Sequence, residues 1–98
     1  MKELLCGKLN IIVEEESNKV NMTWLGESRE INPSSFLDPY LTDVVTQIEN
    51  KGKKPLTVDF TKLHTMNSST VKPILLFIKA LEEKGVKAEL FYNDKLSW

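Results

Sequence analysis

Residues Pro55–Ala80 read PLTVDFTKLHTMNSSTVKPILLFIKA, and this stretch decides the fold. Apolar and polar side chains alternate over residues 55–61, which predicts a half-buried strand. A polar turn at Asn67–Thr70 follows, and apolar residues then recur at helical spacing over residues 68–84, which predicts a helix. The turn therefore places hydroxyl groups at a helix N-terminus, where free backbone N–H groups and the helix dipole favour an anion.

The flanking sequence supplies the other elements of one small α/β domain. The predicted order is strand, strand, helix, strand, helix, strand, with strands at residues 8–15, 20–25, 55–61 and 87–92 and helices at 32–50 and 68–84. Asp38 followed by Pro39 offers one start for the first helix. A short first turn predicts an antiparallel hairpin, whereas the last helix predicts a right-handed crossover between parallel strands. We therefore expect a mixed four-stranded sheet in a single domain that spans residues 1–98.

The strand at residues 55–61 also predicts how the sheet is covered. A strand with helices on both faces would be nearly continuous in apolar residues, and this one alternates. We therefore expect both helices on one face of the sheet. The expected core consists of Ile11, Val13, Met22, Trp24, Leu41, Val45, Ile48, Val58, Phe60, Ile74, Leu75, Ile78, Leu81 and Leu90.

Composition excludes several functional classes. The 98 residues are 41% hydrophobic and 28% charged, as in ordinary globular domains. The net charge is −1 with no basic stripe, which gives nucleic-acid binding little support. No apolar run approaches the roughly 20 residues that span a bilayer. Cys6 is the single cysteine, so no internal disulfide forms and a reducing cytoplasm is the default location.

Enzymatic, metal-binding and nucleotide-binding functions are also poorly supported. His64 is the only histidine and lies far from Cys6 in the sequence, so we expect neither a metal nor a cofactor. A serine nucleophile needs a base, and His64 has no recognisable acid partner, so we do not expect an enzyme. No glycine-rich phosphate loop is present. By pattern alone, the polar residues Asn67–Thr70 are good helix caps.

The segment VDFTKLHTMNSSTVKPILLFIKAL resembles the core motif of STAS domains, the family of anti-sigma factor antagonists. In that motif an aspartate ends a strand. The loop after it carries an apolar residue, an Asp or Asn, and then a hydroxyl residue followed by serine. Here those places are held by Asp59, Met66, Asn67, Ser68 and Ser69. The element order is compatible with the family over roughly residues 9–92.

Two bacterial subgroups of this family are similar to the sequence in further details. Antagonist-like proteins with an NSSG-like loop carry a tryptophan after the last strand, a place that Trp98 could fill. Biofilm-associated STAS-like regulators have an NTSS-like loop and an upstream Gly-Glu-Ser segment, which resembles Gly26–Ser28. The sequence departs from the motif at two positions: Asn67 replaces the commoner aspartate, and Thr70 stands where many members have glycine.

The resemblance implies a STAS-like fold and a non-enzymatic partner switch in bacterial signalling. A serine kinase of the anti-sigma type would phosphorylate Ser68, a PP2C-like phosphatase would reverse the modification, and phosphorylation would release a downstream effector. Ser68 would be exposed and Ser69 would point inward as a cap. The loop and partner contacts would be Asn67, Ser69, Thr70, Met66 and Asp59. The alternative is a constitutive protein-binding or assembly domain in which Ser68 and Ser69 are only helix caps.

The end of the sequence carries one more expectation. Family members usually continue into another helix after the last strand, and here only six residues follow residue 92. An apolar surface should then remain where that C-terminal helix would pack. Because exposed apolar surfaces favour association, we expect self-association, such as a homodimer, through this region.

Overall fold

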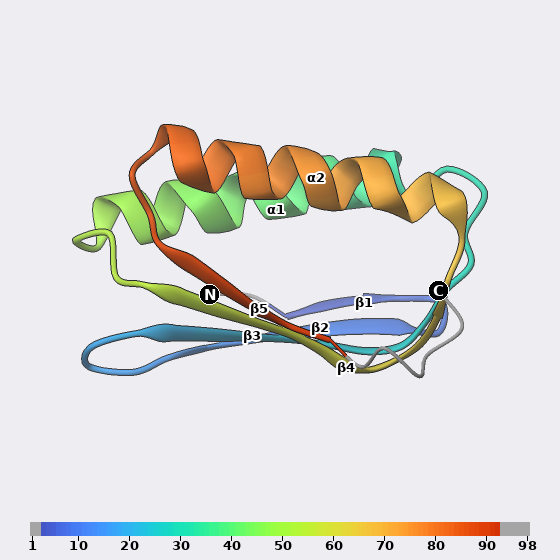
Figure 1. Ribbon diagram of the computed structural model, residues 1–98. Coiled ribbons are helices and arrows are strands. Elements are labelled where there is room, and N and C mark those ends of the chain that lie inside the picture. Colours follow the sequence, from blue (N-terminus) through green and yellow to red (C-terminus); the bar gives the residue numbers. More distant parts are fainter. Residues whose placement is uncertain (1–2, 93–98) are drawn as a thin grey trace.

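The structure, a computed structural model, describes residues 3–92, and Trp98 lies outside the described residues. Its elements are β1 (Leu4–Cys6), β2 (Leu9–Glu15), β3 (Val20–Ser28), α1 (Ser34–Asn50), β4 (Leu56–Met66), α2 (Ser68–Glu83) and β5 (Ala88–Phe91). They form one sheet with both helices packed on the same face (Figure 1). The expected α/β architecture is confirmed. The described sheet has one strand more than expected, because β1 pairs with β2 at its edge.

The strands lie in the sheet in the order in which they occur in the sequence. The pairs β1–β2 and β2–β3 are antiparallel, whereas β3–β4 and β4–β5 are parallel. Both parallel pairs advance in the same direction across the sheet. Two right-handed crossovers that advance in the same direction put their helices on the same face, as is observed for α1 and α2.

The core lies between this face of the sheet and the two helices. Trp24 on β3 and Phe60 on β4 pack with their ring centroids 5.3 Å apart at an interplanar angle of 49°. Burying an apolar side chain of this kind contributes roughly 1.5–3 kcal/mol. The expected core residues that are buried are Ile11, Val13, Met22, Trp24, Leu41, Val45, Ile48, Val58, Phe60, Ile74 and Leu81.

The expected rotation of α2 about its own axis is wrong. Leu75 is 60% exposed and Leu90 on β5 is 37% exposed, although both were expected in the core. Ile78 is only partly buried. The residues that α2 buries are Thr70, Pro73, Ile74, Phe77 and Leu81. Apolar residues surround most of this helix, so their spacing does not define a single face, and polar contacts of Thr70 decide which face is buried.

Both helices begin with two serines and carry a proline in the second turn. α1 begins at Ser34 rather than at Asp38, and the backbone N–H of Leu37 donates to the carbonyl of Pro33 over 2.8 Å. Pro39 therefore lies inside α1, as Pro73 lies inside α2. A proline this close to a helix start removes few backbone hydrogen bonds, which is why both helices continue past it.

Strand β4 continues to Met66, five residues beyond its expected end. Its pairing with β3 shifts register twice, between Thr23 and Leu25 and again between Gly26 and Glu27. At each shift β4 has one residue more than β3, which is the arrangement of a β-bulge. The bulges interrupt the alternation of buried and exposed side chains after residue 60, and so the sequence pattern stops before the strand does.

Candidate functional site

Two segments that lie far apart in the sequence meet where β3 and β4 end. Ser28, the last residue of β3, lies opposite Met66, the last residue of β4. The backbone N–H of Asn67 donates to the carbonyl of Ser28 over 2.9 Å. The Gly26–Ser28 segment and the loop that precedes α2 therefore form one structural unit.

A chain of hydrogen bonds that begins in the core and ends at the surface holds this unit together. The hydroxyl of Thr70 donates to Oδ1 of Asn67 over 2.7 Å, and the Ser28 and Thr70 hydroxyl oxygens are 2.7 Å apart. Because the single hydroxyl proton of Thr70 goes to Asn67, Ser28 must be the donor to Thr70. Nδ2 of Asn67 in turn donates to the carbonyl of Glu30 over 2.8 Å. Ser28 and Thr70 are fully buried, so the chain fixes both the loop and the rotation of α2.

This geometry gives a reason for both departures from the STAS motif. An aspartate at position 67 could accept from Thr70 but could not donate to the carbonyl of Glu30, and two oxygens would then face each other. A glycine at position 70 would leave the buried hydroxyl of Ser28 without its acceptor. Asn67 and Thr70 are therefore two parts of one hydrogen-bonded arrangement that also needs Ser28.

Ser68 and Ser69 occupy the first turn of α2, and both are exposed. Neither hydroxyl forms a hydrogen bond with another residue of the described range 3–92. The expectation that Ser69 points inward is wrong, because Thr70 takes the inward position. Thr70 is 0% exposed and so does not contribute to the surface that a partner would contact, contrary to expectation.

The other two expected site residues lie in different places. Met66 is half-buried and packs against the core directly before the loop. Asp59 lies seven residues earlier on β4, roughly 20 Å away at the usual rise of a strand. Its carboxylate accepts from the backbone N–H of Thr61 over 2.8 Å and from the Thr61 hydroxyl over 2.6 Å, at the first bulge. The structure therefore brings Met66, but not Asp59, close to Ser68.

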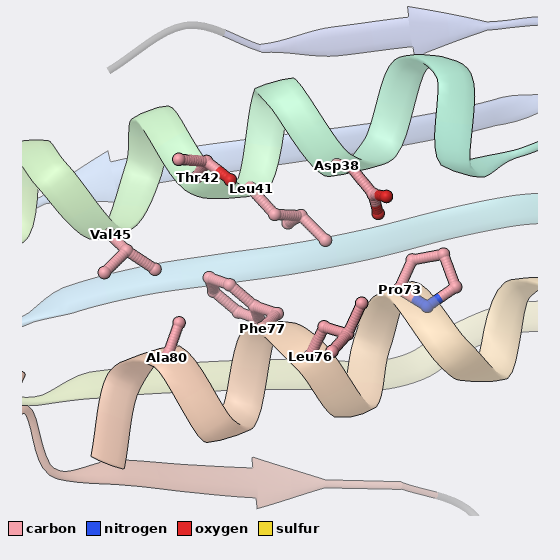
Figure 2. Close-up of a pocket in the computed structure, with 8 residues that line it drawn as sticks. All are labelled: Asp38, Leu41, Thr42, Val45, Pro73, Leu76, Phe77 and Ala80. Carbon is pink, nitrogen blue, oxygen red and sulfur yellow. The ribbon is translucent and has the colours of Figure 1, made fainter. Parts of the chain in front are cut away.

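A groove lies between the two helices. It has a volume of about 190 Å³ and is lined by Asp38, Leu41, Thr42, Val45, Pro73, Leu76, Phe77 and Ala80. Figure 2 shows that these side chains come from the facing sides of α1 and α2. The groove is smaller than the roughly 300–1,000 Å³ of typical ligand pockets, and only Asp38 and Thr42 give it polar character. It offers no set of groups that could carry out a reaction.

Ion pairs lie at both ends of the sheet. Arg29 Nη2 is 3.1 Å from Glu27 Oε1 beside this loop, whereas Glu15 pairs with two lysines at the opposite end. Hydrogen bonds from Lys54 (2.8 Å) and Lys51 (2.9 Å) lower the pKa of Glu15 to about 2. Within residues 3–92, no three His, Cys, Asp or Glu side chains are grouped as metal ligands. Neither helix in that range is long and apolar enough to cross a membrane.

The architecture is similar to that of known structures. No protein-family model matches the sequence, and no curated protein matches it significantly. Among solved structures, the STAS domain of an anti-sigma factor antagonist from Rhodobacter sphaeroides superposes with a TM-score of 0.57 over 85% of each chain. This protein has a STAS-like fold. The identity to that domain is 10%, so the similarity establishes the fold and nothing further.

The STAS-like fold is also similar to part of a larger protein, Mglu. One Mglu structure gives a TM-score of 0.66 at 21% identity over 87% of this chain and 20% of Mglu. Mglu in its L-glutamate binding form, in the presence of 4.3 M NaCl, gives 0.59 at 11% identity over 88% of this chain and 27% of that chain. The chain thus spans about a fifth to a quarter of the Mglu structures that it matches.

Sequence reasoning missed the segment that connects β3 to α1 in this STAS-like fold. Ile31 is 95% exposed, although its neighbours on both sides are held in place. The carbonyl of Glu30 accepts from Asn67, and the carbonyl of Asn32 accepts from the Ser35 hydroxyl over 2.9 Å. An apolar side chain on a backbone that is hydrogen-bonded on both sides therefore projects into solvent beside the loop of Ser68. In the sequence, only the Gly26–Ser28 segment just before Ile31 indicated that this part of the chain has a role.

Proposed function

We propose that this protein is a non-enzymatic signalling module, similar to anti-sigma factor antagonists, that is switched by reversible phosphorylation of Ser68. One observation carries the proposal: the hydroxyl of Ser68 is exposed on the first turn of α2 within a STAS-like fold. The loop around it is held by Asn67, Thr70 and Ser28, and Ser68 takes no part in that network. Its hydroxyl is therefore free to react while the loop keeps its shape.

The local electrostatics suit a phosphate at this position. Phosphorylation adds roughly −1.5 to −2 charges and three strong acceptor oxygens. The first N–H groups of a helix lack intrahelical acceptors and attract an anion. Lys72 is exposed four residues along α2, on the same side of the helix as Ser68, and can pair with the phosphate. The modified protein should therefore remain folded, and the main change should be the charge of its surface.

This change of charge would control a partner that docks over Ser68 and Ile31. The unmodified surface offers an exposed apolar side chain beside uncharged hydroxyls, which suits a protein partner. A dianion at Ser68 would have to be desolvated in that interface, and so the partner would be released. The proposed partner proteins are a serine kinase of the anti-sigma type, a PP2C-like phosphatase and a downstream effector, all in a bacterial cytoplasm.

The alternative function is a constitutive binding domain in which Ser68 and Ser69 only cap α2. Within the described residues the N-cap is Asn67, whose side chain makes no capping hydrogen bond, and neither serine hydroxyl has a partner. These observations give the capping interpretation no specific support. Both experiments below distinguish this constitutive binding domain from the phosphorylation switch.

The first experiment maps phosphate on the protein isolated from the cells in which it occurs. We expect mass spectrometry to find a phosphate on Ser68 in the wild type and in Ser69→Ala, and none in Ser68→Ala. The wild type and both variants should have the same circular dichroism spectrum. Phosphate only at another residue, or none under any growth condition, would leave a constitutive binding domain as the better description.

The second experiment tests release of the partner. A partner that co-purifies with the unmodified protein should bind Ser68→Asp much more weakly. The control is Ser17→Asp, which adds the same charge in the exposed turn between β2 and β3, at the opposite end of β3 from this surface. Equal binding by both variants and the wild type would contradict the switch.

A further inference from the structure

The outer edge of β5 has unpaired backbone groups. The backbone N–H of Leu56 donates to the carbonyl of Lys87 over 2.8 Å, and β5 pairs in parallel with β4. Backbone groups of successive strand residues point to opposite sides within the sheet plane, so those of Lys87, Glu89 and Phe91 face β4. The N–H and C=O groups of Ala88 and Leu90 then point away from the sheet. Within residues 3–92 no other strand pairs with this edge.

Apart from its shortness, this four-residue edge has little that prevents strand pairing, with Lys87 directly before it and Glu89 within it. Natural edge strands carry lysines, prolines or bulges that keep other strands away. In β5, by contrast, Leu90 lies on the face that carries the helices and Phe91 on the opposite face, and both are exposed. Tyr92 beside them is exposed as well. Figure 1 shows α2 and β5 at the same side of the molecule.

We propose that a second copy of this chain pairs with β5, antiparallel, about a two-fold axis near Leu90. Two identical strands in antiparallel orientation offer each other matching donors and acceptors, so a copy of the chain satisfies all four outward groups of Ala88 and Leu90. The pairing would join two five-stranded sheets edge to edge.

The side chains of β5 favour one register. An axis at Glu89 would set two glutamates directly opposite each other, which is unfavourable. An axis at Leu90 instead sets Leu90 against its own copy and Ala88 against Tyr92. The exposed apolar residues of the strand then meet one another, and each Glu89 lies opposite Phe91 of the copy.

The expected dimer is weak and depends on concentration. A four-residue strand with a few flanking side chains buries less than the roughly 1,200 Å² at which stable interfaces begin. The pairing is independent of the proposed function, because it uses neither Ser68 nor the loop before α2.

Sedimentation equilibrium from micromolar to millimolar concentrations tests the proposal. The apparent mass of the wild type should rise from the 11.2 kDa of the chain towards twice that value. Ala88→Pro removes an outward N–H at an edge position that tolerates proline, and Leu90→Lys sets two cations opposite each other. Both variants should stay monomeric. The control, Leu5→Lys, changes the exposed leucine of β1 at the other edge and should associate like the wild type.

Two results would overturn the proposal. One is a wild type that stays at 11.2 kDa at millimolar concentration. The other is an association that Leu90→Lys leaves intact, including one that only Leu5→Lys abolishes, since that would locate the contact elsewhere. If circular dichroism shows that Ala88→Pro is unfolded, Leu90→Lys alone decides the question.

Discussion

Replacing Thr70 by valine should destabilise the protein by about 2–3 kcal/mol. The change keeps the shape of the side chain and replaces its hydroxyl by a methyl group. Ser28 then loses its acceptor and Asn67 loses its donor. The Ser28 hydroxyl is 1% exposed and cannot turn to water, so it should account for most of the loss, since an unpaired buried group costs about 1–3 kcal/mol. Asn67 is partly exposed and can bind water instead, so its share should be smaller.

A double-mutant cycle separates this cause from a loss of packing. Ser28→Ala alone leaves Thr70 still donating to Asn67, so it should cost about 1 kcal/mol. The double variant Ser28→Ala/Thr70→Val contains no unpaired buried hydroxyl at this place. Its loss should therefore be smaller than the sum of the two single losses by about 1 kcal/mol or more.

Urea unfolding followed by circular dichroism measures these free energies through linear extrapolation. Thr46→Val is the matched control, because that hydroxyl donates to the carbonyl of Thr42 over 3.0 Å on the exposed side of α1. It should change the free energy of unfolding by no more than about 0.5 kcal/mol. The reasoning is refuted if Thr70→Val costs no more than Thr46→Val, or if the losses of the cycle simply add.

Three further predictions concern the core, a close approach between the backbones of neighbouring segments, and the response to acid. Phe77→Ala should cost about 3–5 kcal/mol and Leu75→Ala less than about 1 kcal/mol in the same urea assay; equal losses would mean that α2 is rotated differently. Gly26→Ala should cost more than about 2 kcal/mol, because the residue has a φ of +89° and its new methyl group would meet a backbone carbonyl; an unchanged unfolding midpoint would contradict this. The lowered pKa of Glu15 should stabilise the fold fully above its ordinary pKa of 4.5 and progressively less as the pH falls towards 2, and Glu15→Gln should remove that part of the pH dependence. A Glu15 carboxyl that titrates near 4.5 by NMR would rule it out.

The order of strands and helices could be predicted because it depends on local periodicity and on the handedness of crossovers. The rotation of α2 could not, because it depends on a hydrogen bond between Thr70 and Ser28, which are 42 residues apart. β1 was missed because three residues show too little alternation to indicate a strand. The full length of β4 was missed because its bulges break the pattern.

At the candidate site, the motif located the loop and the exposed Ser68. It could not show which hydroxyl is buried. Three hydroxyl residues in a row at a helix start are equivalent by propensity, and only the neighbouring end of β3 distinguishes Thr70 from the two serines. For the same reason Ile31 had no visible role in the sequence, since its position depends on Asn67.

The sequential order of the strands bears on how the chain folds as it is made. Each strand pairs with the one synthesised just before it, so a growing chain always finds the edge it needs already in place. Within residues 3–92 no strand has to be inserted between two others, although each parallel pair forms only after the helix between its strands has been made. This order allows the sheet to grow strand by strand from the N-terminus onwards. The β2–β3 hairpin then serves as the template, and β5 joins last.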